Sequence, residues 1–530
     1  MNTTDNLIPL PQHVTPLDGP AFTLTGTTRI AATAEAGPVA AQLAAFLRGG
    51  TGFELPLADT FRPGDIALEL GAALDGGPEA YALTVTDAGA RLRASTPAGL
   101  FNGIQTLRQL FAPSIERSLT HPGGPDGDSG SWAIPAVEIH DAPRFAYRGL
   151  MLDVARSFFT VEEVKEQIDV MAQFKFNALH LHLTDDQAWR IEIHAPENNP
   201  SGLDYANLTA IGGAVDHPGV GLTPGHTGFY TQQDYRDIQA YAATRNIVVV
   251  PEIDLPGHVN AALAAIPQLN PDGVAKPGNT TGDVGYSTLT ADLPATYEFV
   301  SEVLGQIAAI TDGPYLHIGG DEAHVTGHDN YVTMVTEFAR IGAATGKTVV
   351  GWNEYAQVQL PEGSVAQYWW GDFEPVVRQA EDGASQVIMS PAANTYLDQK
   401  YDSASPIGLS WVEGGPFTWS EYYDWNPAQG GLEDRHILGV EGPLWTETVR
   451  GNQQAYWLLY PRAISLAEVG WTQQEARGLG DFRRRLGAFG ERLANQGVGF
   501  QAAPDVEWSA KLADPFTELN STSEYGTIEA

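Results

Sequence analysis

The run Ala178-Leu179-His180-Leu181-His182-Leu183 is rich in apolar residues and passes directly into the polar stretch Thr184-Asp185-Asp186. A short apolar run with a polar end is typical of a buried β-strand that carries reactive side chains at its carboxyl end. From about residue 145 onward, further runs of this kind alternate with helical stretches, which indicates βα units and a parallel sheet. The eight runs span residues 148–154, 178–183, 247–253, 315–318, 348–351, 365–368, 386–389 and 437–440.

Eight parallel strands with intervening helices predict an α/β fold, a (β/α)8 TIM barrel, which we place at residues 144–498. The first crossover helix has a clear start, because Thr160-Val161-Glu162-Glu163 matches a capping box. Val161, Val164, Ile168 and Met171 then share one helical face. The interval between Gly351 and Val365 is too short for a full helix with its loops, so we expect an irregular fifth unit.

Residues 1–143 read as a smaller α+β domain that precedes the barrel. Short β-rich runs occur at 21–25, 28–32 and 66–70, and the runs 81–86 and 91–94 flank a hairpin signal at Asp87-Ala88-Gly89. Helical spacing of apolar residues predicts a helix over 98–111. The Gly- and Pro-rich residues 121–131 predict a surface loop, and the tail 499–530 carries no motif.

The amino-acid composition excludes several classes of function for this protein. The 530 residues contain 29 Lys and Arg against 65 Asp and Glu, which gives a net charge of −36, and they contain no cysteine. Thiolate metal sites, disulfides and a cysteine nucleophile are therefore excluded. The negative charge opposes binding to nucleic acid or to an anionic membrane. The amino terminus lacks a signal-like segment and no apolar run could span a bilayer, so the sequence as given predicts a cytoplasmic protein, unless a signal peptide was removed.

Polar clusters follow all eight predicted strands, and seven of the clusters contain a carboxylate. Catalytic residues of such barrels collect at the carboxyl ends of the strands, so these side chains should converge. Several carboxylates with several tryptophans and one arginine suit a polyhydroxylated ring, because indole stacks on the C–H face of a sugar while the charged groups bind its hydroxyls.

The neighbours Asp321 and Glu322 present a geometric difficulty. Successive side chains of a strand point to opposite faces, so both enter one pocket only if Gly319-Gly320 breaks the strand. A conventional retaining pair also lies on separate elements, with carboxyl groups about 5–5.5 Å apart. Two adjacent carboxylates should instead repel, which raises the pKa of one toward an acid role while the other stays ionised.

In combination these residues resemble the family 20 glycoside hydrolases, the β-N-acetylhexosaminidases. The similarity covers roughly residues 148–447, keeps the order of the family's motifs, and extends to the small domain that commonly precedes this barrel. The matching motifs are Leu152-Asp153-Val154-Ala155-Arg156, Leu179–Asp186, Pro251–His258, His317-Ile318-Gly319-Gly320-Asp321-Glu322, Gly351-Trp352-Asn353-Glu354, Tyr396-Leu397-Asp398 and Leu444-Trp445-Thr446-Glu447.

The resemblance implies hydrolysis assisted by the substrate's own 2-acetamido group, which is an exception to the two-carboxylate mechanism. Glu322 would be the general acid/base, Asp321 would orient the acetamido group, and Tyr396 would donate a hydrogen bond to its oxygen. Because the acetamido oxygen is the nucleophile, no second carboxylate is needed across the ring. The resemblance implies neither a cofactor nor a metal; the expected partner is a carbohydrate, and the oligomeric state is not predicted.

The resemblance also implies a set of substrate-binding and supporting residues. Arg156, Glu447 and Asp398 would hold the hydroxyls of the non-reducing sugar, and Trp352, Trp369 and Trp445 would form the walls of the pocket. Asp185 and His258 match positions that contact the sugar or support those that do, and Asp254 would pair with His258 in a relay behind Glu322. On the residues alone, Arg156 could instead be a buried ion-pair partner of Asp153, and His180 and His182 could be packed core histidines.

Three other functions remain open at this point. The spacing His180-x-His182 suits a metal-dependent hydrolase, although Trp352-Asn353-Glu354 and Tyr368-Trp369-Trp370 stand where such a site needs further histidines. A catalytically silent carbohydrate-binding protein could use the same fold. A disaccharide-releasing enzyme of the same family would share most of these residues, but Arg156, Asp398 and Glu447 would close the pocket around one terminal sugar, which favours the exo mode.

Overall fold

The computed structural model describes residues 3–71, 73–117, 132–214, 226–279, 281–510 and 516. Two compact units are present: the first comprises Met1–Ala146, Ala172–Lys175 and Ala467–Asp514, and the second comprises Tyr147–Met171, Phe176–Leu466 and Pro515–Ala530. The predicted loop at 121–131 and most of the tail beyond residue 510 lie outside the described residues.

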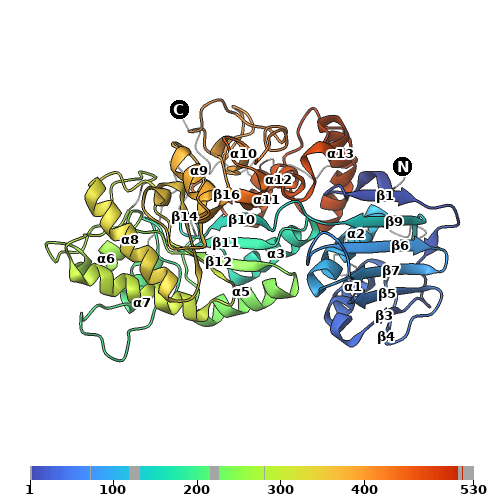
Figure 1. The fold of residues 1–530 in the computed structure, drawn as a ribbon, viewed down its shortest axis with the longest axis horizontal. Helices are drawn as coiled ribbons and strands as arrows, with labels where there is room; N and C mark the ends of the chain where they lie inside the picture. Colours follow the sequence, from blue (N-terminus) through green and yellow to red (C-terminus); the bar gives the residue numbers. More distant parts are fainter. Residues whose placement is uncertain are drawn as a thin grey trace. The chain divides into compact units, whose positions relative to one another are not determined.

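The first unit is built on a seven-stranded mixed sheet in the order β1-β9-β6-β7-β5-β3-β4 (Figure 1). Its hairpin is formed as predicted, because β6 and β7 pair antiparallel around a turn at Asp87 and Ala88. A separate two-stranded ribbon pairs β2 with β8. The strands are β1 (His13–Pro16), β2 (Phe22–Thr23), β3 (Ile30–Ala32), β4 (Leu57–Ala58), β5 (Asp65–Leu70), β6 (Tyr81–Thr86), β7 (Gly89–Ala94), β8 (Ala133–Ile134) and β9 (Val137–Asp141).

Helices α1 (Gly37–Thr51) and α2 (Pro97–Leu110) pack on this sheet. The second of them is the helix predicted at 98–111, and Thr96 caps it by accepting a hydrogen bond from the backbone N–H of Gly99. Helix α13 (Leu479–Gln496) also belongs to this unit. The predicted barrel range of 144–498 therefore differs from the compact unit, because Ala467–Asp514 group with the amino-terminal residues.

The second unit is a closed barrel of eight parallel strands, β10 to β17 in chain order (Figure 1). All eight predicted runs are strands, so the fold class inferred from the sequence is confirmed. Buried apolar side chains from several of these strands form one hydrophobic cluster, which includes Tyr147, Ala178, Val250, Val350 and Ile388. The strands are β10 (Tyr147–Asp153), β11 (Ala178–His182), β12 (Val248–Glu252), β13 (Tyr315–His317), β14 (Thr348–Trp352), β15 (Ser364–Tyr368), β16 (Ser385–Met389) and β17 (Ile437–Leu444).

The predicted capping box opens the first crossover helix: the Thr160 backbone N–H donates to Glu163 at 2.8 Å, and the Glu163 N–H donates to the Thr160 hydroxyl at 3.3 Å. The fifth crossover is irregular as expected, since only the 3-10 helix η6 (Asn353–Gln357) separates β14 from β15. The remaining helices are α3 (Val161–Gln173), α4 (Ala206–Ala210), α5 (Gln232–Thr244), α6 (Asn260–Ala265), α7 (Pro294–Ile310), α8 (His328–Ala344), α9 (Glu374–Glu381), α10 (Ala392–Thr395), α11 (Asn452–Leu459) and α12 (Arg462–Trp471).

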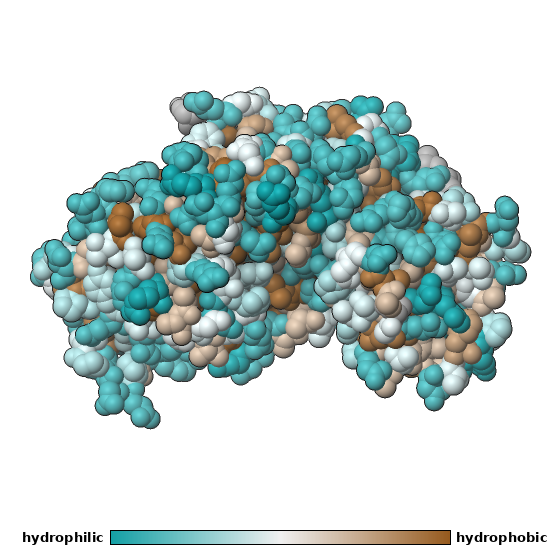
Figure 2. Space-filling view, in the orientation of Figure 1, coloured by the Kyte–Doolittle hydropathy of each residue, from teal (hydrophilic) through white to brown (hydrophobic). Residues whose placement is uncertain are grey.

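The surface in Figure 2 is predominantly hydrophilic, with apolar residues in small scattered groups. This is the usual appearance of a well-solvated protein surface. Among the residues that the structure describes, none of the helices combines the length and apolar character that a bilayer span requires.

Candidate active site

Asp321 and Glu322 enter one site because the backbone turns sharply after β13. The strand ends at His317, and Gly319 and Gly320 then adopt φ values of 67° and 113°. A Cβ atom at position 319 would lie 1.7 Å from the Asp254 carboxylate, so only glycine fits there. Glu322 itself has a left-handed φ of 45°, which is strained for a side chain of its size. The glycine pair therefore breaks the strand as the sequence predicts.

His258 lies beside both of these carboxylates. Its Nε2 atom is 3.4 Å from Glu322 Oε2 and 3.7 Å from Asp321 Oδ2. Burial raises the pKa of Asp321 to about 6, with the positive His258 opposing the rise and Glu322 adding to it. Asp321 Oδ1 is buried and has no hydrogen-bond partner among the described residues, so it is available to a ligand.

The carboxylate behind His258 is Asp185. His258 Nδ1 lies 3.1 Å from Asp185 Oδ1, so the relay runs from Asp185 through His258 to Glu322. Asp185 Oδ2 is also held by His182 Nε2 at 2.7 Å and by Arg156 Nη2 at 2.8 Å. These cations hold the pKa of Asp185 well below its usual range despite burial. These contacts agree with a position that supports the site, one of the two alternatives left open for Asp185; the substrate contact stays a prediction.

Asp254 was predicted to pair with His258, and the geometry corrects this. Within the described ranges, no hydrogen bond joins the two side chains; Asp254 Oδ1 instead accepts from the backbone N–H of Gly320 at 3.3 Å. Burial, reinforced by the nearby Asp321, raises the pKa of Asp254 well above its usual value. Asp254 therefore supports the backbone turn that carries Asp321, since the Gly319 backbone packs directly on it.

Arg156 is more deeply embedded than a simple ligand clamp. Besides its ion pair with Asp185, it donates from Nε to Gln187 Oε1 at 2.8 Å, and its Nη1 lies 3.5 Å from Asp153. Burial opposes its charge, but Asp185, Asp153 and Glu447 raise its pKa further. The ion pair between Arg156 and Asp153, which the sequence left open as an alternative, is therefore present, but it is longer than the ion pair with Asp185. Arg156 also lies 5.0 Å from the ring centroid of Trp445.

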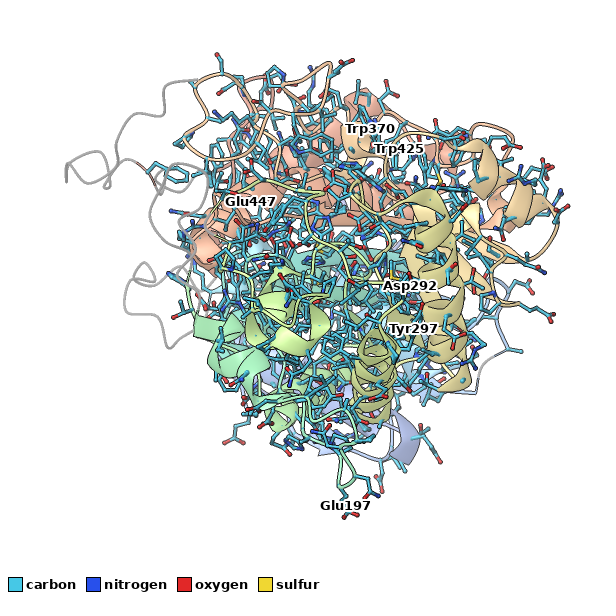
Figure 3. The ribbon with its side chains drawn as sticks, turned by 90° about the vertical axis from the view of Figure 1, so that its left-hand side faces the viewer. Glu197, Asp292, Tyr297, Trp370, Trp425 and Glu447 are labelled. Carbon is cyan, nitrogen blue, oxygen red and sulfur yellow. The ribbon has the colours of Figure 1, made fainter. Side chains whose placement is uncertain are left out.

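Asp398 and Glu447 each keep a buried oxygen without a partner in the described part of the chain, Asp398 Oδ1 and Glu447 Oε2. Burial and the negative charge of Glu447 raise the pKa of Asp398 to about 8. Burial also raises the pKa of Glu447, with Arg156 opposing the rise. Two carboxyl groups that influence each other, each with one oxygen that no described residue hydrogen-bonds, are suited to bind hydroxyl donors of one ligand. Glu447 is labelled in the upper half of Figure 3.

Aromatic rings surround the phenol of Tyr396. Trp369 stacks on it at 6.0 Å between ring centroids, and Trp445 lies 6.3 Å away. Trp352 is fully buried, and its ring centroid lies 6.1 Å from that of Trp445, so it forms the floor of the aromatic pocket. Burial and the surrounding carboxylates raise the pKa of Tyr396 well above its usual value, which keeps its hydroxyl protonated as a hydrogen-bond donor. The predicted aromatic residues are therefore brought together.

The sequence analysis assigned no role to Trp411 or to Glu354, although Glu354 stands in one of the matching motifs. Trp411 is 44% exposed and packs edge-on to Tyr396, at 5.6 Å, and to Trp369 and Trp370. It lies in an irregular segment between β16 and β17, where no periodic pattern marks it. Glu354 accepts the indole N–H of Trp369 at 3.1 Å, and burial raises its pKa to about 8. Its position directly after Trp352-Asn353 was the one available signal.

His180 and His182 are fully buried, as the core-histidine alternative expects, but each lies between two carboxylates. His180 contacts Glu441 and Glu252, and His182 contacts Glu252 and Asp185. A metal at His182 would have to displace hydrogen bonds at both ring nitrogens, whereas His180 Nε2 has no hydrogen-bond partner among the described residues. The groups with suitable spacing for a metal ion are His180/Glu252/His317, His182/Glu252/Asp254, Asp185/Asp186/His258 and Asp254/His258/Asp321.

A closed (β/α)8 barrel whose strand ends carry an acid pair, unpaired carboxylates and aromatic walls defines the class of glycoside-cleaving barrel enzymes. The family-model comparison agrees with this class. The catalytic domain of glycosyl hydrolase family 20 matches residues 145–337 and 326–474, and domain 2 of the same family matches residues 4–142.

Individual relatives cover nearly the whole chain. A β-N-acetylhexosaminidase of Cellulomonas fimi is 38% identical over 96% of this chain and 98% of its own. The Streptomyces plicatus N-acetyl-β-hexosaminidase bound to Thio-NAglucal is 42% identical over 96% of this chain and 98% of its own, with a TM-score of 0.87. A mutant of that enzyme in complex with the product GlcNAc gives a TM-score of 0.86 at 41% identity, over the same shares of the two chains. The chain therefore belongs to glycosyl hydrolase family 20.

Proposed function

We propose that the protein is an exo-acting β-N-acetylhexosaminidase that releases terminal N-acetylglucosamine or N-acetylgalactosamine from β-glycosides with retention of configuration. The observation that carries this proposal is the delivery of Asp321 and Glu322 to one site by the left-handed turn after β13. A neighbouring pair of this kind suits a reaction in which the substrate supplies its own nucleophile. The full-length similarity to named hexosaminidases supports the same activity.

In the first step the acetamido carbonyl oxygen attacks the anomeric carbon while the bond from that carbon to the leaving oxygen breaks. Glu322 gives its proton to the leaving oxygen. Asp321, through its unpartnered Oδ1, accepts the acetamido N–H and stabilises the positive charge that develops on the nitrogen. Tyr396 donates its hydroxyl to the acetamido oxygen and orients it for attack. The products of this step are a cyclic oxazolinium ion and the free leaving group.

In the second step water attacks the anomeric carbon from the face that the leaving group vacated. Glu322, now ionised, takes the proton from this water, and the bond to the acetamido oxygen breaks. Two inversions give net retention. His258 supports both states of Glu322, because the Asp185 carboxylate on its other nitrogen keeps the ring protonated and oriented; the pKa of His258 is raised well above its usual value by Asp185, Asp254 and Asp321 against the effect of burial.

The exo mode follows from the unpaired groups at the other side of the site. Asp398 and Glu447 present buried oxygens that have no hydrogen-bond partner in the described part of the chain, and the charge of Arg156 acts on Glu447. A terminal sugar offers its 3-, 4- and 6-hydroxyls to such groups, whereas an internal sugar would place a further ring against them. These residues therefore close the site around a single non-reducing sugar.

The proposal is tested with chromogenic N-acetylglucosaminides and N-acetylgalactosaminides, a thiazoline that mimics the oxazolinium ion, and NMR of the first-formed anomer. We expect a β-configured product and competitive inhibition by the thiazoline at concentrations well below KM. An α-configured product would contradict the mechanism. Loss of activity on exhaustive chelation would instead favour the metal-dependent alternative.

A further inference from the structure

Glu252, at the carboxyl end of β12, is completely buried and lies against four ring nitrogens. His182 Nδ1 is 2.5 Å away and the indole N–H of Trp352 donates at 2.8 Å. His180 Nε2 and His317 Nδ1 each lie 3.1 Å from it. Two of these groups hydrogen-bond to Glu252, His182 through Nδ1 to Oε2 and Trp352 through its indole N–H to Oε1, so each carboxylate oxygen has a partner in a different part of the site.

The contact of Glu252 with His182 connects it to the acid/base residue Glu322. His182 bridges Glu252 and Asp185, with 2.5 Å from Nδ1 and 2.7 Å from Nε2, and both carboxylates are buried. An imidazole between two carboxylates donates from both nitrogens only when it is protonated. The charge of Glu252 raises the pKa of His182 well above its usual value although burial opposes this. The protonated ring fixes Asp185, and Asp185 fixes the His258 ring that lies against Glu322.

A second contact of Glu252 joins it to Trp352, the floor of the aromatic pocket. Trp352 is fully buried, and its indole N–H donates to Glu252 Oε1. The ring lies 6.1 Å from Trp445, which borders Tyr396. A buried indole N–H without an acceptor is costly, so the acceptor determines which rotamer of Trp352 is stable.

We propose that Glu252 is a positioning residue that holds two parts of the site at once, the acid/base arm through His182 and the acetamido-pocket floor through Trp352. This rests on the proposed function, because both parts are defined by that reaction. A glutamine at position 252 keeps the size of the side chain but offers one acceptor oxygen and turns an N–H toward groups that already donate. The one oxygen that remains cannot accept fully from both His182 and Trp352, so the two contacts compete for it and both are weakened.

The test is Glu252→Gln assayed with two substrate pairs. The first pair differs in leaving group, 4-nitrophenyl against phenyl N-acetyl-β-glucosaminide, because the poorer leaving group depends more on proton donation by Glu322. We expect kcat/KM to fall about 10-fold more for the phenyl glycoside than for the nitrophenyl one, since general-acid catalysis contributes roughly 10²–10⁴-fold.

The second pair differs in the N-acyl group, N-acetyl against N-propionyl on the same nitrophenyl glycoside. One extra methylene in a fitted apolar pocket costs roughly 10–200-fold. If Glu252 holds the floor in place, the preference for N-acetyl should fall several-fold in Glu252→Gln. A purely structural role would reduce the amount of active enzyme and leave both ratios unchanged.

His182→Gln separates the two effects and serves as the second variant if Glu252→Gln does not fold. The amide of glutamine can still donate to Asp185 but cannot also bind Glu252, while Trp352 keeps its acceptor. We therefore expect the leaving-group ratio to change in His182→Gln and the N-acyl ratio to stay at the wild-type value.

Glu441→Gln is the matched control. Glu441 is equally buried, within strand β17, and it accepts from His180 at 2.9 Å and from Gln367 at 2.7 Å, but neither His182 nor Trp352 donates to it among the described residues. We expect wild-type values of both ratios in this variant, whatever its thermal stability.

Two results would overturn the inference: unchanged ratios in both Glu252→Gln and His182→Gln, or equal changes in Glu441→Gln. The proposed function fails separately, if the wild-type enzyme cleaves neither N-acetyl glycoside. If the wild type is active but the ratios are unchanged in the variants, the proposed role of Glu252 is refuted while the hexosaminidase activity stands.

Discussion

The two units each contain a buried group of charges, and the two groups differ in how completely they are paired. In the first unit Lys175 Nζ lies 3.1 Å from both Asp141 Oδ2 and the Tyr81 hydroxyl. Asp141 also accepts from Tyr81 at 2.6 Å and from the Trp471 indole at 3.0 Å. In the barrel, Asp321, Asp398 and Glu447 each retain a buried oxygen that has no hydrogen-bond partner among the described residues.

The difference separates a structural cluster from a functional one. A buried charge is tolerated when partners satisfy it, so removing one partner from the closed cluster around Asp141 should destabilise its unit. An unsatisfied buried carboxylate is a cost that a ligand can remove. Variants of the first cluster should therefore change stability, and variants of the second should change catalysis or binding.

The largest expected effect belongs to Glu322→Gln. The variant keeps the size of the side chain but cannot donate a proton to the leaving oxygen, so kcat on a phenyl N-acetylglucosaminide should fall roughly 10²–10⁴-fold. Steady-state kinetics beside a thermal unfolding curve measures this. We expect a melting temperature close to that of the wild type. A fall in kcat of less than tenfold would mean that another residue is the acid.

Lys175→Met tests the closed cluster. Removing one partner of a buried ion pair costs about 3–5 kcal/mol, because the other charge stays buried. Chemical denaturation should show this loss in the free energy of unfolding, while kcat/KM per folded molecule stays constant. Lys165→Met is the control: Lys165 pairs with an exposed glutamate, Glu162, at 3.0 Å, so the cost should be below about 1 kcal/mol. Equal losses in the two variants would contradict the distinction.

Glu447→Gln tests the open cluster away from the reacting bond. A hydrogen bond to a charged group contributes about 1.5–3 kcal/mol, so KM should rise roughly 10- to 100-fold with a smaller change in kcat. Inhibition by free N-acetylglucosamine should weaken by a similar factor. If kcat falls while KM is unchanged, Glu447 acts in the chemical step.

The smallest change is expected from pH alone. Asp321 must be ionised to accept the acetamido N–H, and burial raises its pKa to about 6. On the acidic limb of the pH profile, kcat/KM should therefore stay constant as long as the pH is above about 6. It should fall as the pH drops through about 6. A pH profile with one substrate measures this. A flat profile down to pH 4 would mean that Asp321 is not needed in its ionised form.

Most of the barrel and the members of its site were predictable from the sequence. Each strand is a short apolar run that ends in polar residues, and this local pattern is sufficient because both faces of a barrel strand are buried. The need for a strand break at Gly319-Gly320 also followed from the alternation of side chains, and the positive φ values of both glycines satisfy it.

The pairing within the site was less predictable. Asp185 and Asp254 both follow neighbouring strands, so the sequence gives each an equal claim to His258. The choice depends on the backbone of His258, which has a left-handed φ of 53°, and on Arg156 and His182, which already orient Asp185. The grouping of Ala467–Asp514 with the first unit escaped prediction for a similar reason. An amphipathic helix such as α13 shows which of its faces is buried but does not show which element covers that face.

The most direct test of the account compares two substrates that differ only at the 2-position: 4-nitrophenyl N-acetyl-β-glucosaminide and 4-nitrophenyl β-glucoside. Asp321 and Tyr396 have no acetamido group to orient in the glucoside, which also lacks the nucleophile. We expect kcat/KM for the acetamido sugar to be higher by several orders of magnitude. Comparable values for the two sugars would contradict the substrate-assisted mechanism on which the account rests.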